Sequence, residues 1–281
     1  MKSVCVGDNV IDYYVNSGKM FPGGNSLNVA VHLARLGCDS AYLGNIGDDD
    51  MAKVILRALR DNGVDCRQCQ FIENGTTKHC NYEVIDGERT FINVELGDNW
   101  SGPMVLNEER LAYLNQADVV ISNCNAKMSE EMKKISRLDA IYVYDFGEKE
   151  KYHADEYLSM VCDRLDLAMF SLPSADERTL VSFARKIMNS GCVNVLITMG
   201  THGQYLINEK NVVHGEADRI DAVDTMGAGD AFLAAFICRL KELGWQKGEI
   251  LEKDRVTEAL KCAGRYAGEN CLREGGFGEE V

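Results

Sequence analysis

The sequence predicts an α/β protein with a doubly wound, mostly parallel sheet and a small β-sheet lid. Apolar β-type runs alternate with amphipathic helical runs along most of the chain, as expected when helical crossovers join parallel strands. Residues 77–96 break this alternation, because they predict a β-hairpin that no helix covers. The chain has 281 residues, 46% of them hydrophobic, which suits a single α/β domain of residues 1–281.

Composition and charge argue against several functions. A formal net charge of −14 disfavours a nucleic-acid surface, which needs clustered Lys and Arg. No run of about 18 apolar residues exists that would span a membrane. The first residues predict a strand, not a secretory signal, and the eleven cysteines fit buried, reduced thiols. We therefore expect a cytoplasmic protein that binds neither nucleic acid nor membrane.

The first strand and the first helix frame a candidate ligand site. Val4–Gly7 predicts a buried strand, and ligands of parallel sheets collect beyond the carboxyl ends of strands. Asp8 follows directly and is expected to be a turn residue. After a β-type stretch, Tyr13–Phe21, the turn Pro22-Gly23-Gly24 leads into a helix that runs to about Leu36. Asn25 or Ser26 is expected to cap that helix.

The next segment predicts a strand, a helix and the uncovered hairpin. The strand is Ala41–Ile46, and Asp48–Asp50 is expected to cap a helix that runs through Leu59. A divalent metal at these three aspartates is the less favoured alternative. Thr77–Ile85 and Arg89–Leu96 form the hairpin, joined by a type I′ turn at Asp86-Gly87.

Cys66 and Cys69 form the one spacing that suggests zinc. They are placed in a β-type run, and His79 and Cys80 follow. Adjacent strand residues face opposite ways, so those two side chains cannot easily share an ion. Without a clean second pair, a metal role is disfavoured.

From Leu106 onward the alternation of strands and helices resumes. The expected strands are Val119–Ser122, Ile141–Tyr144, Leu167–Ser171 and Val193–Thr198, and the expected helices lie around 108–116, 128–136, 153–163 and 254–272. Asp145 ends one strand on the ligand edge, where it either points at a substrate or closes a turn. Ser174 and Glu177 form a capping-box pattern before a further helix.

The residues Asp224–Phe232 carry the strongest chemical signal. A β-type run, Arg219–Val223, leads into Gly227-Ala228-Gly229, and an apolar helical run, Ala231–Leu243, follows. Such a corner leaves backbone N–H groups without helical partners and makes a pocket for an anion. Asp230 lies beside that pocket, which suits phosphoryl transfer to a hydroxyl. The alternative is an ordinary corner in which Asp230 only complements the helix dipole.

Other phosphate and nucleophile motifs are absent from the sequence. No GxxxxGK followed by Ser or Thr occurs, which argues against a P-loop kinase. No GxGxxG follows a strand, and there is no GxSxG nucleophile elbow. The turn at 227–229 is therefore the candidate phosphate cradle.

The nonapeptide Asp224–Phe232 resembles the C-terminal signature of the ribokinase-like (PfkB) family of sugar and nucleoside kinases. Gly23-Gly24, with Asn28 four residues on, matches the N-terminal signature of that family, so the resemblance spans nearly the full chain. It implies an ATP-dependent kinase that transfers the γ-phosphate to a sugar hydroxyl. Asp230 would be the catalytic base, and the backbone of Gly227, Ala228 and Gly229 would hold the transferring charge.

The resemblance also assigns binding residues. It implies that the sugar is bound by Asp12, Gly23, Gly24 and Asn28, and that Arg89 either touches the sugar or is a solvated hairpin charge. The nucleotide side would consist of Thr198, Gly200, Gly203, Asp224 and Thr225. Glu177 would organise Mg²⁺ through water and phosphate, although Ser174 stands where the family usually has Asn. A monovalent cation near Asp224 and the tail at 275–277 is left open.

The lid and the substrate are further implications of the resemblance. A lid of about residues 12–21 and 76–97 would close over the sugar and form a homodimer contact. The Gly7-Asp8-Asn9 opening and the stretch Val143–Phe146 are most similar to kinases that phosphorylate the 6-hydroxyl of fructoselysine. A related fructosamine fits equally, and a ribose, fructose or nucleoside kinase is the alternative. A non-catalytic sugar or nucleotide sensor is disfavoured by the intact Asp230.

Overall fold

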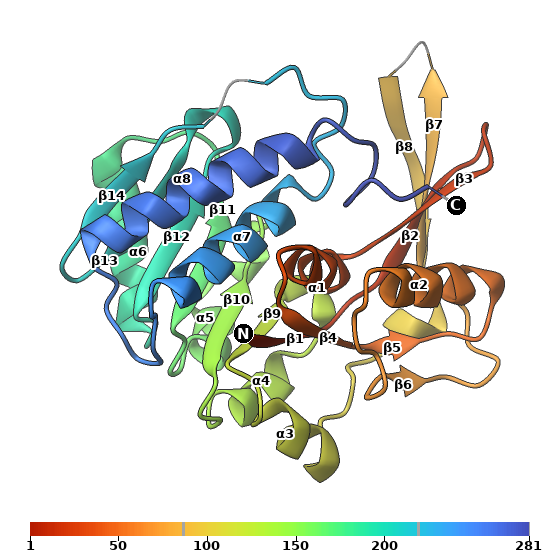
Figure 1. Ribbon diagram of the computed structural model, residues 1–281, viewed down its shortest axis with the longest axis horizontal. Coiled ribbons are helices and arrows are strands. Elements are labelled where there is room, and N and C mark those ends of the chain that lie inside the picture. Colours follow the sequence, from red (N-terminus) through yellow and green to blue (C-terminus); the bar gives the residue numbers. More distant parts are fainter. Residues whose placement is uncertain (86–87, 218–219, 281) are drawn as a thin grey trace.

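A long central sheet organises the chain. The computed structural model describes residues 1–85, 88–217 and 220–280, with the backbone alone at 84, 85, 88 and 89. The eight strands lie in the order β14-β13-β12-β11-β10-β9-β1-β4 (Figure 1). In chain order they are β1 (Lys2–Val6), β4 (Asp39–Leu43), β9 (Val119–Asn123), β10 (Ile141–Asp145), β11 (Leu167–Ser171), β12 (Asn194–Thr198), β13 (Gln204–Asn208) and β14 (Val212–Gly215). All neighbours from β4 to β12 are parallel, and β13 is antiparallel to both of its neighbours.

Helices cover both faces of this sheet, which confirms the doubly wound α/β prediction. The helices that share one apolar core are α1 (Asn25–Arg35), α2 (Asp50–Asp61), α7 (Ala228–Glu242) and α8 (Lys253–Asn270). The helices that share the other core are α3 (Glu108–Leu114), α4 (Ser129–Ile135), α5 (Asp155–Val161) and α6 (Glu177–Asn189). Successive strand residues alternate between the cores, since Val4 and Val6 enter the second while Cys5 enters the first. Burying both faces explains the nearly continuous apolar runs of the strands.

A separate four-stranded sheet, the lid sheet, stands beside the central one (Figure 1). Its order is β3 (Lys19–Gly23), β2 (Val10–Tyr14), β7 (His79–Ile85) and β8 (Glu88–Glu95). The single β-type stretch expected at Tyr13–Phe21 is in fact the β2–β3 hairpin, which turns at Gly18 with φ 74°. The predicted turn Asp86-Gly87 lies outside the described residues.

Short elements complete the described chain. They are the strands β5 (Asn45–Ile46) and β6 (Gln70–Phe71) and the 3₁₀ turns η1 (Asp98–Trp100), η2 (Cys124–Ala126), η3 (Glu150–Tyr152) and η4 (Gly200–His202). The strand expected at Ala41–Ile46 is divided at Gly44, because β4 joins the central sheet and β5 pairs with β6. Cys66 and Cys69 form a turn, with Cys69 N donating to Cys66 O, and not the expected β run. None of the helices described in the structure is long and apolar enough to cross a membrane.

The expected strand Arg219–Val223 is not formed over its described part. Residues 220–223 run as a loop, and the backbone N–H groups of Val223 and Asp224 both donate to Cys271 O (2.8 and 3.2 Å). A carbonyl just beyond α8 therefore satisfies donors that a sheet neighbour would otherwise take. The β-type residues are overridden because the tail of the chain packs against this segment.

Two predicted helix caps are also wrong. Helix α6 is capped by Asp176, whose carboxylate accepts from Thr179 N (2.8 Å), so Ser174 is not its N-cap. Asn25 and Ser26 lie inside α1, and the N-cap is Gly24, which has no side chain to offer. The cap is supplied from a distant part of the chain.

Candidate active site

The loop before α7 forms a tight corner that requires glycine. Gly227 is the N-cap of α7 in the left-handed region (φ 69°), and a Cβ there would collide with the backbone of Gly276. Ala228 N donates to Thr225 O (3.2 Å), so this amide stabilises the corner. Within the described residues the amides of Gly227, Gly229 and Asp230 have no such partner. They provide the donors and the dipole end that an anion needs.

Asp230 lies in the first turn of α7 and is only 6% exposed. Asn28 Nδ2 donates to its Oδ2 (2.8 Å), and Asn25 Nδ2 donates to its Oδ1 (3.2 Å). Both amides come from α1, which packs against α7. The structure thus brings the predicted base and the predicted sugar residue Asn28 into direct contact, although they are 202 positions apart.

Two further aspartates extend this network. Asn25 Nδ2 also donates to Asp145 Oδ2 (3.4 Å) at the end of β10. Asp8 accepts from the backbone N–H groups of Asn25 (3.2 Å) and Ser26 (3.3 Å), so it caps α1 from outside the helix. Its expected role as a turn residue is therefore corrected. Asn123 Nδ2 donates to the same carboxylate (2.8 Å).

The environment makes two of these carboxyl groups unusually basic. Burial raises the pKa of Asp230 well above its ordinary value, and the charges of Asp145 and Asp8 raise it further, against hydrogen bonds from Asn28 and Asn25. Burial likewise raises the pKa of Asp145 to about 6, partly opposed by donors from Gly147 N and Asn25. A carboxylate with a raised pKa is a better proton acceptor than an exposed one.

The residues predicted to bind sugar converge on the same corner. Asp12 is 5% exposed on β2, and a Cβ placed on Gly23 would lie 3.5 Å from Asp12 Oδ2 and 3.7 Å from Asn28 Oδ1. Asn28 Oδ1 is buried and accepts no hydrogen bond from the described residues. Gly24 has φ 110°, and a Cβ there would lie 2.7 Å from Asn9 Cα, so only glycine fits. Arg89 belongs to β8, and its side chain lies outside the described residues.

The residues predicted to bind nucleotide lie along the same edge of the central sheet. Thr198 ends β12, with its hydroxyl 3.2 Å from Ser171 Oγ. Gly200 (φ 55°) and Gly203 (φ 86°) follow, and a Cβ on Gly203 would collide with Gly215 O. In the described chain, none of these three residues hydrogen-bonds to Asp230.

Asp224 and Thr225 belong to the loop before α7. Asp224 accepts from Met226 N (2.9 Å) and Gly275 N (3.0 Å), so it ties this loop to the tail of the chain. Thr225 is exposed, and its carbonyl accepts the Ala228 amide.

The predicted metal residue stands alone. Glu177 is the first residue of α6 and is exposed, with no hydrogen-bond or ion-pair partner among the described residues. Across 1–85, 88–217 and 220–280, no three His, Cys, Asp or Glu side chains are grouped to hold a metal. A free carboxylate suits magnesium that arrives with phosphates, because Mg²⁺ in such sites takes one or two protein carboxylates and keeps water.

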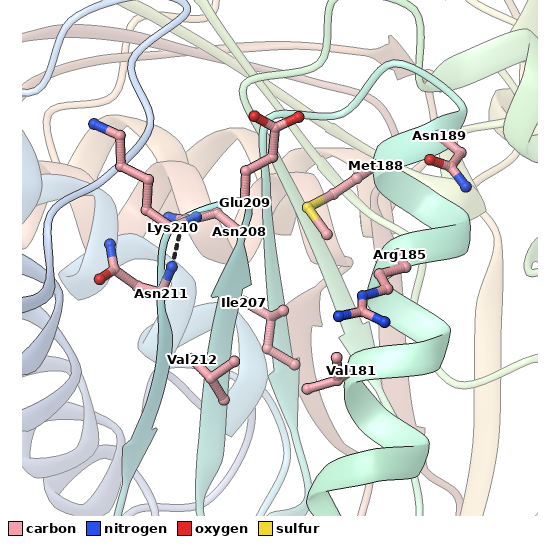
Figure 2. A pocket seen from close by; sticks show the side chains of 10 residues that line it. All are labelled: Val181, Arg185, Met188, Asn189, Ile207, Asn208, Glu209, Lys210, Asn211 and Val212. Atoms are coloured by element: carbon pink, nitrogen blue, oxygen red, sulfur yellow. Dashed lines mark hydrogen bonds between the residues drawn. The ribbon is translucent and has the colours of Figure 1, made fainter.

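A cavity of about 380 Å³ lies away from Asp230, between α6 and the β13–β14 turn (Figure 2). Its residues include Asn208, which pairs with the first residue of β12, while Gln204 pairs with the last. The cavity therefore lies at the amino ends of the parallel strands. Asp230 and the glycine corner lie at the carboxyl ends, where ligands of open α/β sheets bind.

Sequence reasoning missed part of the network. The sequence predicts only a helix cap at Asn25 or Ser26 and either a substrate contact or a turn at Asp145, and no motif indicates Asn123 or Asn125. A signal was present, since Asp8, Asn123 and Asp145 each lie at or just beyond the end of β1, β9 or β10. These strands are adjacent in the sheet, but their order is not written in the sequence.

Comparison with known proteins gives a consistent result. The model of the pfkB family carbohydrate kinases matches residues 3–277. The chain is 30% identical over 284 residues to the fructosamine kinase FrlD of Bacillus subtilis (strain 168), covering 99% of this chain and 93% of that protein. It is 30% identical over 263 residues to the fructoselysine 6-kinase of Escherichia coli (strain K12), covering 92% of this chain and 95% of that protein.

A solved structure shows the same fold. The Arabidopsis thaliana ribokinase complexed with ribose and ATP superposes with a TM-score of 0.79 at 21% identity, covering 98% of this chain and 93% of that one. The fold, the glycine corner with its buried aspartate, and the match over 3–277 all indicate the same family. The chain belongs to the pfkB family of carbohydrate kinases and is an ATP-dependent sugar kinase.

Proposed function

We propose that this kinase phosphorylates the 6-hydroxyl of fructoselysine or a related fructosamine, with Asp230 as the general base. The observation that carries the assignment of the base is the buried Asp230 carboxylate in the first turn of α7, held by Asn28 of α1. The substrate class rests on the two relatives at 30% identity, whose names specify fructosamine and fructoselysine.

The charge around the site supports a cationic substrate. Asp8, Asp145 and Asp230 form no ion pair with Lys or Arg within the described residues. A fructosamine carries a secondary ammonium, which a negative pocket favours. Ribose and nucleosides carry no such charge at neutral pH.

The proposed reaction follows from the geometry. The substrate hydroxyl oxygen forms a bond to the γ-phosphorus while the bond from that phosphorus to the bridging oxygen of ADP breaks, and the hydroxyl proton passes to Asp230. The amides of Gly227, Gly229 and Asp230 face the developing negative charge at the start of α7. Asn28 Oδ1 and Asp12 supply acceptors for sugar hydroxyls.

Asp230→Asn tests the base. The amide keeps the shape of the side chain but cannot accept the proton, so turnover is expected to fall by at least ~10²-fold. Asp166→Asn is the control, because Asp166 is also buried but lies just before β11, at the amino ends of the parallel strands and away from the site. Near-normal turnover in Asp230→Asn would remove Asp230 from the mechanism.

A substrate panel tests the specificity. Fructoselysine, other fructosyl-amines, fructose, ribose and adenosine are offered at equal concentration with ATP, and ADP release is measured. We expect the highest kcat/KM with a fructosyl-amine. If ribose or adenosine turns over well while fructosyl-amines are ignored, the fructosamine assignment is wrong and the kinase assignment stands.

We also propose roles for two cations. Glu177 would hold Mg²⁺ through water, and the ion would supply positive charge to neutralise the nucleotide phosphates. A monovalent cation would be held by backbone carbonyls near Asp224 and near the tail at 275–277, two segments that meet where Gly275 N donates to Asp224 (3.0 Å). Assays with EDTA and with potassium replaced by choline test these roles: loss of activity is expected in both, and unchanged activity would contradict each role separately.

We propose that the kinase is a cytoplasmic homodimer joined through its lid sheet. The eleven cysteines are all free, as in a reducing compartment. The strand β8 is at the edge of the lid sheet, and the side chains of Phe91, Ile92 and Val94 on it are exposed. An exposed apolar edge strand pairs readily with another strand.

A further inference from the structure

One side-chain amide lies between two buried carboxyl groups. Asn25 Nδ2 donates to Asp230 Oδ1 (3.2 Å) and to Asp145 Oδ2 (3.4 Å). Its orientation is fixed, because Asn125 Nδ2 donates to Asn25 Oδ1 (3.0 Å). Both hydrogens of the amide are therefore directed at carboxylates, and Asp230 is linked through Asn25 to Asp145.

Local structure does not explain why residue 145 is an aspartate and carries a charge. Asp145 Oδ1 accepts from Gly147 N (2.8 Å), which closes the turn after β10. A neutral Asn at this position would accept the same hydrogen bond. Asp145 is 6% exposed and has no Lys or Arg partner in the described chain, so its charge is costly there. A buried charge beside another carboxylate acts mainly on that neighbour.

We propose that Asp145 is a positioning residue for the phosphoryl-transfer reaction: the Asn25 amide that it shares with Asp230 holds the Asp230 carboxylate toward the glycine corner, and the like charge of Asp145 makes that carboxylate a stronger base. This inference rests on the proposed role of Asp230. Asp145 itself does not touch the reacting atoms. It acts on Asp230 through the shared amide and through the repulsion between like charges.

The other titratable groups that face Asp230 do not replace Asp145. Cys5 of β1 is buried near Asp230, and Cys124 of η2 is buried near Asp145; burial raises the pKa of both thiols, so they stay neutral. Asp8 also raises the pKa of Asp230, but it accepts two backbone N–H groups at the start of α1 and the side-chain amide of Asn123. Its charge is therefore largely compensated, whereas Asp145 shares its side-chain donor with Asp230.

The test is the pH dependence of kcat/KM, measured for wild type, Asp145→Asn and Asn25→Ala with the best sugar substrate and ATP. Loss of the like charge in Asp145→Asn lowers the pKa of the base, so the acid limb moves to lower pH, by about one unit. Loss of the donor in Asn25→Ala raises that pKa, so the acid limb moves to higher pH. Asp166→Asn, the buried control, leaves the limb in place.

Opposite shifts in the two variants support the proposal, because a merely structural role would lower activity without moving the limb. An unchanged limb in Asp145→Asn overturns it. If that variant does not fold, as judged by circular dichroism, the Asn25→Ala profile decides alone: a limb that stays or moves to lower pH overturns the proposal. High turnover in Asp230→Asn would instead show that the base itself is misassigned, whatever Asp145 does.

Discussion

Side-chain amides, and not cations, hold the acidic groups of the site in place. Asn25, Asn28 and Asn123 direct their Nδ2 groups at the carboxylates of Asp230, Asp145 and Asp8. An amide donor orients a carboxylate without neutralising it. The negative potential is therefore preserved, as the proposed ammonium-bearing substrate and the proposed proton transfer to Asp230 require.

His32 is a buried titratable residue of α1, and it makes stability depend on pH. It is 1% exposed, with Nδ1 3.1 Å from Tyr266 Oη and Nε2 3.1 Å from Gly276 O. Because Gly276 O can only accept, Nε2 carries the proton and Nδ1 accepts from the tyrosine. Burial lowers the pKa of His32 to about 4.

As the pH falls, unfolded chains therefore bind a proton at His32 at a higher pH than folded chains do. Its stabilising contribution is fully present above pH ~6.5, the unfolded pKa, and is lost as the pH falls toward 4, by at most about 1.4 kcal/mol per unit. Urea unfolding at several pH values should show a shallower decline for His32→Gln than for wild type. The exposed His202→Gln is the control, and equal declines in all three proteins would contradict the prediction.

Among the elements, α2 depends on one capping aspartate that also anchors the lid sheet. Asp49 accepts from Ala52 N (2.8 Å) at the start of α2, and from Thr77 N (2.7 Å) and Thr77 Oγ1 (2.6 Å) just before β7. A single side chain thus joins a helix that covers the central sheet to the lid sheet.

Asp49→Ala should destabilise the protein by about 2 kcal/mol, since it removes a cap and leaves donors of Thr77 unpaired. The neighbouring Asp50→Ala is the control, because the Asp50 side chain is 94% exposed and pairs only with Lys53 at the surface. Equilibrium unfolding of both variants measures the difference. Equal stabilities would show that the cap contributes nothing.

The sequence predicted most elements because a two-sided core imposes clear apolar periodicity on helices and strands. It also indicates Asp230, Gly23, Gly24 and Asn28 as candidate site residues, because they belong to local motifs, and the structure brings them to one corner. The prediction of a helix cap was wrong where the capping side chain lies far from the helix in the sequence, as Asp8 does from α1. The link from Asn25 to Asp145 needs the strand order β10-β9-β1, which no local pattern encodes.

For the whole molecule, the testable property is the proposed homodimer. Ile92→Lys/Val94→Lys places charges on the exposed edge strand β8, so it should convert a dimer of 31.2 kDa chains into monomers. Val105→Lys is the control, because Val105 is equally exposed but lies outside the lid sheet. Sedimentation measures the mass. A monomeric wild type, or a double variant that stays dimeric, would refute the proposed interface.

The separation of 202 positions between Asn28 and Asp230 has a consequence for protein synthesis. A ribosome adds about 5–20 residues per second, so some 10–40 seconds pass between the two residues. During that interval the apolar face of α1, with Leu27 and Leu33, lacks the α7 surface that later covers it. On the proposed role of Asp230, the nascent chain is then inactive, and catalytic competence appears only after α7 has emerged from the ribosome and packed against α1.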